Sequence, residues 1–76
     1  MYTTKIHLAT INDVKQFVNI VNLYDFDVDL SAGRYKVDAK SIMGIFSLDL
    51  SKPMDVEIHT NEPEEFLEKI KAFLVK

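Results

Sequence analysis

The sequence predicts an α+β fold, a four-stranded antiparallel sheet with three helices on one face, in the order β-α-β-β-α-β-α. Two observations lead to this prediction. Four short segments alternate between apolar and polar side chains, which is the period of a strand with one buried face. Three other segments repeat their apolar residues at helical spacing. Elements that are each apolar on one side bury those sides most simply against one another, as an open-faced sandwich.

The alternation defines four expected strands. Gly33 separates two of them and favours a tight turn, so these two should form a β-hairpin. The expected strands are residues 3–8, 26–31, 35–39 and 54–59. Their inward-facing residues are Thr4, Ile6, Leu8, Phe26, Val28, Leu30, Tyr35, Val37, Ala39, Met54, Val56 and Ile58.

Three helices are expected between and after the strands. Thr10, with Asp13 three positions later, fits a capping box and is the expected N-cap of the first helix. Ser41 is the expected N-cap of a short helix over residues 41–48. The last helix is expected over residues 63–75, with glutamates early and Lys69, Lys71 and Lys76 late, as the helix dipole favours. The apolar stripes are Val14, Phe17, Val18 and Val21 in the first helix, and Phe66, Leu67, Ile70, Phe73 and Leu74 in the last.

Length and composition exclude several classes of protein. A chain of 76 residues with 47% hydrophobic content is long enough for one core, so residues 1–76 should form a single domain. The absence of cysteine excludes disulfides, thiolate nucleophiles and cysteine-based metal sites. A net charge of −3 provides no basic stripe for nucleic acid. With no signal-like start and no apolar run long enough for a bilayer, the expected location is the cytoplasm, with a protein partner and no membrane contact.

The bare face of the expected sheet carries the polar residues of the strands. We expect His7 and His59 to lie on this face, where they could approach each other if the first and last strands pair. Two histidines are a weak metal signal, so we expect no metal site and no cofactor. We expect the aspartates of residues 27–29 to be balanced across the hairpin by Arg34 and Lys36. The carboxylates show no pairing that indicates acid–base catalysis, so the sequence predicts no enzyme.

The segment Lys-Ser-Ile-Met-Gly-Ile-Phe-Ser-Leu, residues 40–48, resembles the regulatory-serine motif of HPr proteins, the phosphocarriers of the bacterial sugar phosphotransferase system. The preceding hairpin aligns with that family without a gap, and the resemblance extends from about Phe17 to the C-terminus. It implies the HPr-like open-faced β-sandwich. It also implies that Ser41 is a regulatory phosphorylation site for HPr kinase/phosphorylase. The neighbouring partner-binding residues would be Lys40, Ile42, Met43 and Phe46.

The resemblance fails where the family has its phosphate-carrying histidine. Alignment back from Ser41 puts Thr10 at the position of that histidine, Asn12 at the position of an arginine and Asp13 at the position of a proline. The loop before them is about three residues shorter than in the family. A threonine hydroxyl needs a general base and forms a stable ester, so this alignment predicts a family member that cannot carry phosphate on histidine.

Two functional hypotheses follow. The first is a regulatory binding protein that acts through Ser41 and helix 41–48. It would resemble the catabolite-repression HPr-like proteins (Crh), which when phosphorylated act as corepressors with a LacI-type transcriptional regulator. The second is an interaction module that keeps only the HPr scaffold, with Ser41 serving as a helix cap. A small-ligand-binding βαββαβ module is a third possibility, but no Gly-rich loop supports it. Met43 and Phe46 could be core or surface, and exposure of either one would be the informative result.

Overall fold

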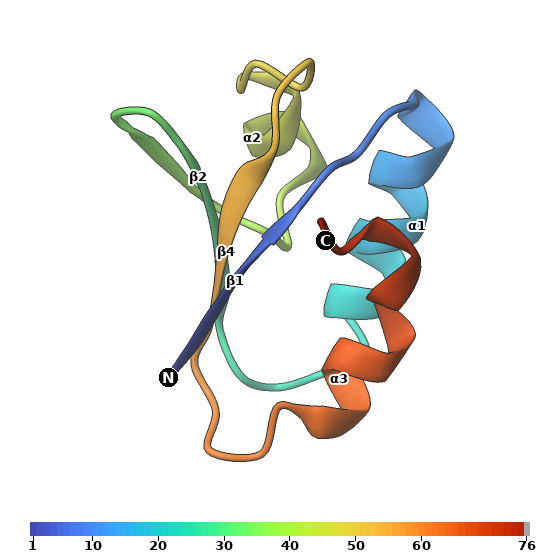
Figure 1. Cartoon of the computed structure of the whole chain (residues 1–76), viewed down its shortest axis with the longest axis vertical. Coiled ribbons are helices and arrows are strands. Elements are labelled where there is room, and N and C mark those ends of the chain that lie inside the picture. Colours follow the sequence, from blue (N-terminus) through green and yellow to red (C-terminus); the bar gives the residue numbers. More distant parts are fainter. Residues whose placement is uncertain (76) are drawn as a thin grey trace.

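The computed structural model describes residues 1–75, which form a four-stranded antiparallel sheet with helices packed against its apolar face (Figure 1). The strands lie in the order β1-β4-β2-β3. This arrangement confirms the predicted α+β fold. The elements are β1 (Tyr2–Ile6), α1 (Ile11–Val21), β2 (Val28–Ala32), β3 (Tyr35–Asp38), α2 (Ile42–Phe46), β4 (Met54–Ile58), α3 (Glu64–Lys69) and the 3₁₀ turn η1 (Lys71–Phe73).

The core lies between the sheet and the helices. Antiparallel pairing brings the inward-facing residues of neighbouring strands opposite one another, so that Val56 of β4 lies between Thr4 of β1 and Leu30 of β2. No polar or charged residue of the described chain is buried. Residues from both the predicted strand faces and the predicted helix stripes form this core. Among them, Phe17, Val21, Val28, Val56, Ile58, Phe66 and Ile70 are fully buried, and Val37 packs against them partly buried.

The start of α1 has the predicted cap. The Thr10 side chain accepts a hydrogen bond from the Asp13 backbone N–H at 3.1 Å. The Asp13 carboxylate in turn accepts one from the Ala9 N–H at 3.1 Å, one residue before the cap. Two backbone donors that have no partner inside the helix are thereby satisfied by side chains of the same segment.

The β2–β3 hairpin turns at Gly33, the only described residue with a positive φ angle, 61°. Glycine adopts this conformation without a steric penalty, and it occupies the first central position of the two-residue turn, as in a type II′ turn. Tyr35 was expected to face inward, but it is 72% exposed. It starts an edge strand beside the turn, and Figure 1 shows this end of the hairpin projecting away from α1 and α3.

The last helix is shorter than predicted. It ends at Lys69, and after η1 the chain is extended at Leu74 (φ −66°, ψ 136°) and runs along the outer edge of β1. The contacts there are a bridge between Leu74 and Ile6, a hydrogen bond from Val75 N to Lys5 O at 3.0 Å, and one from His7 N to Phe73 O at 2.9 Å. Backbone groups on a sheet edge gain partners in this way, which a continued helix could not provide. Lys76, predicted at the end of this helix, lies outside the described residues.

Within residues 1–75, no helix has the length and apolar character needed to cross a bilayer.

Candidate functional site

Ser41 begins α2. Its backbone is extended (φ −101°, ψ 106°), and its Oγ accepts a hydrogen bond from the Gly44 N–H at 3.2 Å, so it is the N-cap that the sequence predicts. The residue is exposed. Its own N–H donates to the Asp38 carbonyl at 3.0 Å, while the Asp38 carboxylate accepts from the Lys40 N–H at 2.8 Å. The serine is therefore held in a defined position at the surface, directly after β3.

Gly44 allows α2 to pack closely against β3. A Cβ atom at this position would lie 3.3 Å from both the Ser41 Oγ and the Val37 Cβ. Both separations are tighter than ordinary van der Waals contact. A larger residue would therefore push either the capping hydroxyl or the strand away.

The side chains of α2 divide between core and surface. Ile45 is fully buried and anchors the helix, and Ile42 is partly buried. Met43 is 76% exposed and Phe46 is 39% exposed. The helix ends at Phe46, before the predicted limit of Leu48, because Ser47 closes it with a hydrogen bond from its hydroxyl to the Gly44 carbonyl at 2.6 Å. Ser41, Met43 and Phe46 together define the α2 surface.

The start of α1 lies at the same end of the molecule as α2 (Figure 1). Thr10 and Asn12 are exposed there, and Ile11 exposes 64% of its surface. The Thr10 hydroxyl is occupied as a cap, and the nearby carboxylate is that of Asp13. This helix start contains no histidine.

A cavity of about 430 Å³ lies elsewhere, between the β2–β3 turn and the α2–β4 loop. It is lined by Ala32, Gly33, Arg34, Tyr35, Ser47, Leu48, Asp49, Lys52 and Pro53. None of the three residues of the α2 surface lines it. The α2 surface therefore lies outside this cavity.

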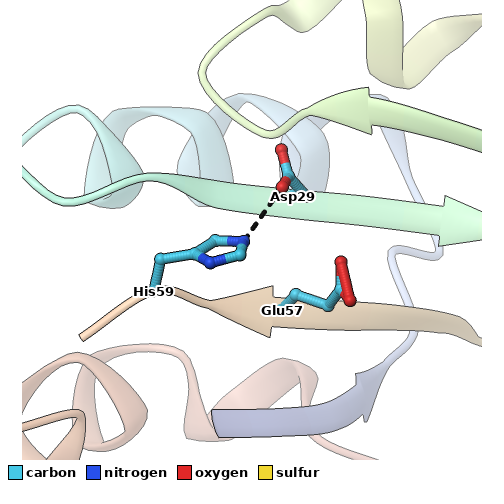
Figure 2. Close-up of side chains that lie close together, drawn as sticks. All are labelled: Asp29, Glu57 and His59. Carbon is cyan, nitrogen blue, oxygen red and sulfur yellow. Dashed lines mark hydrogen bonds and ion pairs between the residues drawn. The ribbon is translucent and has the colours of Figure 1, made fainter. Parts of the chain in front are cut away.

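On the face of the sheet that the helices do not cover, Asp29, Glu57 and His59 form a cluster, the sheet-face triad (Figure 2). Asp29 and Glu57 are directly opposite each other on β2 and β4. The His59 Nε2 lies 3.0 Å from the Asp29 Oδ2. Lys36 forms an ion pair with the Glu57 carboxylate. This contact, together with the negative charges of Glu57 and Asp29, raises the pKa of the Lys36 ammonium and keeps it protonated.

The pairing differs from the predicted balance across the hairpin. Asp29 stands opposite Asp38, and Lys36 stands opposite Ser31. Because Ser31 is small, Lys36 reaches across β2 to Glu57 on the next strand. The two histidines also do not approach each other. Ile6 pairs with Met54 and Tyr2 with Ile58, so His7 and His59 lie beyond opposite ends of the β1–β4 pair.

Sequence reasoning missed the triad because it treated each strand separately. Glu57 and His59 belong to one segment, but Asp29 lies 30 positions before His59 in the sequence. The outward-facing positions were predicted correctly for all three. Only the β2–β4 register brings them together, and alternation within one strand carries no information about that register.

Comparison with known proteins identifies the family. The family model for the PTS HPr component phosphorylation site matches residues 11–76. The crystal structure of HPr-C-His from Thermoanaerobacter tengcongensis is similar, with a TM-score of 0.79 and 23% identity over 95% of this chain and 89% of that one. The phosphocarrier protein HPr from Bacillus anthracis str. Ames has a TM-score of 0.73 and 23% identity over 97% and 96% of the two chains. No curated protein sequence matches. Because the family model spans most of its length, the chain belongs to the HPr family of the phosphotransferase system.

Proposed function

We propose that this chain is an HPr-family protein that does not carry phosphate on histidine and acts as a regulatory binding protein through Ser41 and α2. The observation that carries the proposal is the α2 surface. An exposed serine hydroxyl lies in the same short helix region as two exposed apolar side chains, Met43 and Phe46. Exposed apolar groups beside a modifiable residue are the usual components of a regulated protein interface.

The start of α1 supports the non-carrier part of the proposal. In the alignment with HPr proteins, Thr10 takes the position of the phosphate-carrying histidine. The Asp13 carboxylate already accepts the Ala9 N–H, so it uses a donor that could otherwise hold a phosphoryl group. Its negative charge would also repel an incoming phosphate. Asn12, at the position of the family's arginine, provides no cation.

The surroundings of Ser41 support regulation by phosphorylation. The hydroxyl bonds to the Gly44 N–H of its own helix and the residue is exposed, so a phosphoryl group could be added without disturbing the buried core. Lys40 provides a cation next to it, whereas Asp38 has its carboxylate bonded to the Lys40 N–H. Phosphoserine would place about −1.5 to −2 charges beside the apolar Met43 and Phe46. The partners in this proposal are an HPr kinase/phosphorylase and a LacI-type transcriptional regulator, which would place the protein in the cytoplasm.

The cap itself favours a second candidate, an interaction module that is never phosphorylated. The Ser41 Oγ satisfies the Gly44 N–H, and this structural role is sufficient to explain a serine at this position. In that case the exposed α2 residues would still bind a partner, but no modification would control the contact.

Incubation with an HPr kinase and ATP, followed by intact mass measurement, tests the proposal. We expect the mass of one added phosphoryl group on the wild-type protein and none on Ser41→Ala. Ser47→Ala is the matched control, because Ser47 is the other exposed serine that bonds to Gly44, at the opposite end of α2. It should be modified like the wild type.

Loss of the cap in Ser41→Ala costs about 1 kcal/mol of stability, so circular dichroism should first show that the variant is folded. An unmodified wild-type protein, with a kinase that modifies an HPr carrier in the same tube, would favour the unphosphorylated module.

A further inference from the structure

We propose that the sheet-face triad, Asp29, Glu57 and His59, binds one divalent first-row transition-metal ion such as Zn²⁺ (Figure 2). The site lies on the open face of the sheet, away from α2, and is independent of the regulatory role proposed for Ser41. Two carboxylates and one imidazole form a donor set that zinc, manganese, cobalt and nickel accept. Sequence analysis predicted no metal site because it considered only the two histidines.

The backbone holds the three side chains on one face. Asp29 and Glu57 are register partners on adjacent strands, and His59 follows Glu57 by two positions, so all three point to the same side of the sheet. The backbone pairing with the β2 segment continues one residue past the end of β4, because the His59 N–H donates to the Asp27 carbonyl at 3.0 Å. Ligands anchored on paired strands lose little conformational freedom when they bind an ion.

The donor atoms are already close to the spacing that a metal requires. Two ligands at about 2.0–2.1 Å from a tetrahedral zinc ion lie roughly 3.3 Å apart. The His59 Nε2 and the Asp29 Oδ2 are 3.0 Å apart, and all three ligand atoms lie within 4.8 Å of one another. Small rotations about side-chain bonds would therefore complete the site.

The charge around Glu57 indicates that the cluster attracts a cation. The Glu57 Oε1 is shielded from solvent, and within residues 1–75 its close partner is the Lys36 ammonium. The Lys36 side chain is 54% exposed and reaches this point from β3, so it can move into solvent when a doubly charged ion takes its place. Lys36 is thus a competitor of the metal, and the affinity should depend on it.

The identity of the ligands selects the class of metal. Magnesium and calcium prefer oxygen ligands, and an imidazole ligand favours the later transition metals. The His59 side chain is 37% exposed and that of Asp29 is 28% exposed, so water can reach the ion. Three protein ligands with water in the remaining position would give an open site.

Titration of untagged protein with Zn²⁺ by isothermal calorimetry, and with Co²⁺ by visible absorption, tests this inference. We expect one ion per chain, with no competition from excess Mg²⁺. His59→Asn and Asp29→Asn should each weaken Zn²⁺ binding at least tenfold. His7→Asn is the matched control and should bind like the wild type, because His7 lies beyond the opposite end of the β1–β4 pair. Lys36→Gln should bind more tightly, because the competing ammonium is removed.

Three results would overturn the proposal. They are an absence of binding at millimolar Zn²⁺, equal affinity of His59→Asn and the wild type, or weaker binding by Lys36→Gln. Far-ultraviolet circular dichroism of each variant separates loss of binding from loss of the fold. Since the kinase assay on Ser41 does not involve these residues, failure of either proposal leaves the other in place.

Discussion

Replacing Phe66 with alanine is expected to lower the free energy of unfolding by about 3–5 kcal/mol, the range for a fully buried phenylalanine. Phe66 of α3 is completely buried. Its ring packs edge-on against Tyr24 at 5.4 Å and Phe26 at 5.7 Å between centroids. A domain of this size has a total stability of roughly 4–11 kcal/mol, so the variant should be close to unfolding at room temperature.

Thermal or urea denaturation followed by circular dichroism measures this loss. Phe46→Ala is the matched control, since it makes the same chemical change at a phenylalanine that is 39% exposed. Phe46→Ala should lower the free energy of unfolding much less than Phe66→Ala does. A Phe66→Ala protein as stable as Phe46→Ala would contradict the packing of α3 against the core.

With phosphoenolpyruvate and Enzyme I, which phosphorylates HPr carriers, the chain is expected to acquire no acid-labile phosphoryl group. The start of α1 has a threonine cap and the Asp13 carboxylate, and under the proposed alignment these take the place of the imidazole and the cation that a carrier needs. His7 and His59 are exposed and lie outside this helix start. We therefore expect the wild-type chain to have no carrier activity, rather than a slow phosphoryl transfer.

Intact mass before and after mild acid treatment measures this transfer, with an active HPr carrier as the positive control. His7→Asn and His59→Asn variants would locate any adduct that forms. A stoichiometric, acid-labile adduct on either histidine would contradict the non-carrier proposal.

Local patterns were sufficient for most of the fold. Alternation identified the buried faces of the strands, because side chains two positions apart in a strand lie on the same face. The caps at Thr10 and Ser41 were predicted for a similar reason. Each cap bonds to a backbone N–H three residues later, so its geometry is set within a single turn.

The errors arose where distant segments decide the structure. The apolar spacing of residues 63–75 is typical of a helix, and its residues Phe66, Ile70 and Phe73 are indeed buried. After Lys69, however, the helix ends, and the chain beyond it forms backbone hydrogen bonds with the edge of β1. The ion pair of Lys36 and Glu57 likewise depends on the order of three strands, which no single segment specifies.

The candidate site shows the same difference between features set by local sequence and features set by contacts with distant segments. The motif around Ser41 indicated which residues to consider. The Ser41 cap could be predicted because it depends on a contact within one helical turn. The exposure of Met43 and Phe46 could not be predicted, because a five-residue helix has too few turns for its apolar spacing to define one buried face. The packing of α2 against both β3 and α1 leaves Ile45 buried and Met43 exposed to solvent.

Binding of a LacI-type regulator to kinase-treated protein tests the regulatory proposal most directly. Titration calorimetry should compare phosphorylated wild type, untreated wild type and kinase-treated Ser41→Ala. We predict that only the phosphorylated protein binds tightly, because phosphoserine adds a charged group beside Met43 and Phe46 that a basic groove can recognise. Equal affinity of the regulator for all three proteins would contradict the proposal and leave Ser41 with its role as the cap of α2 alone.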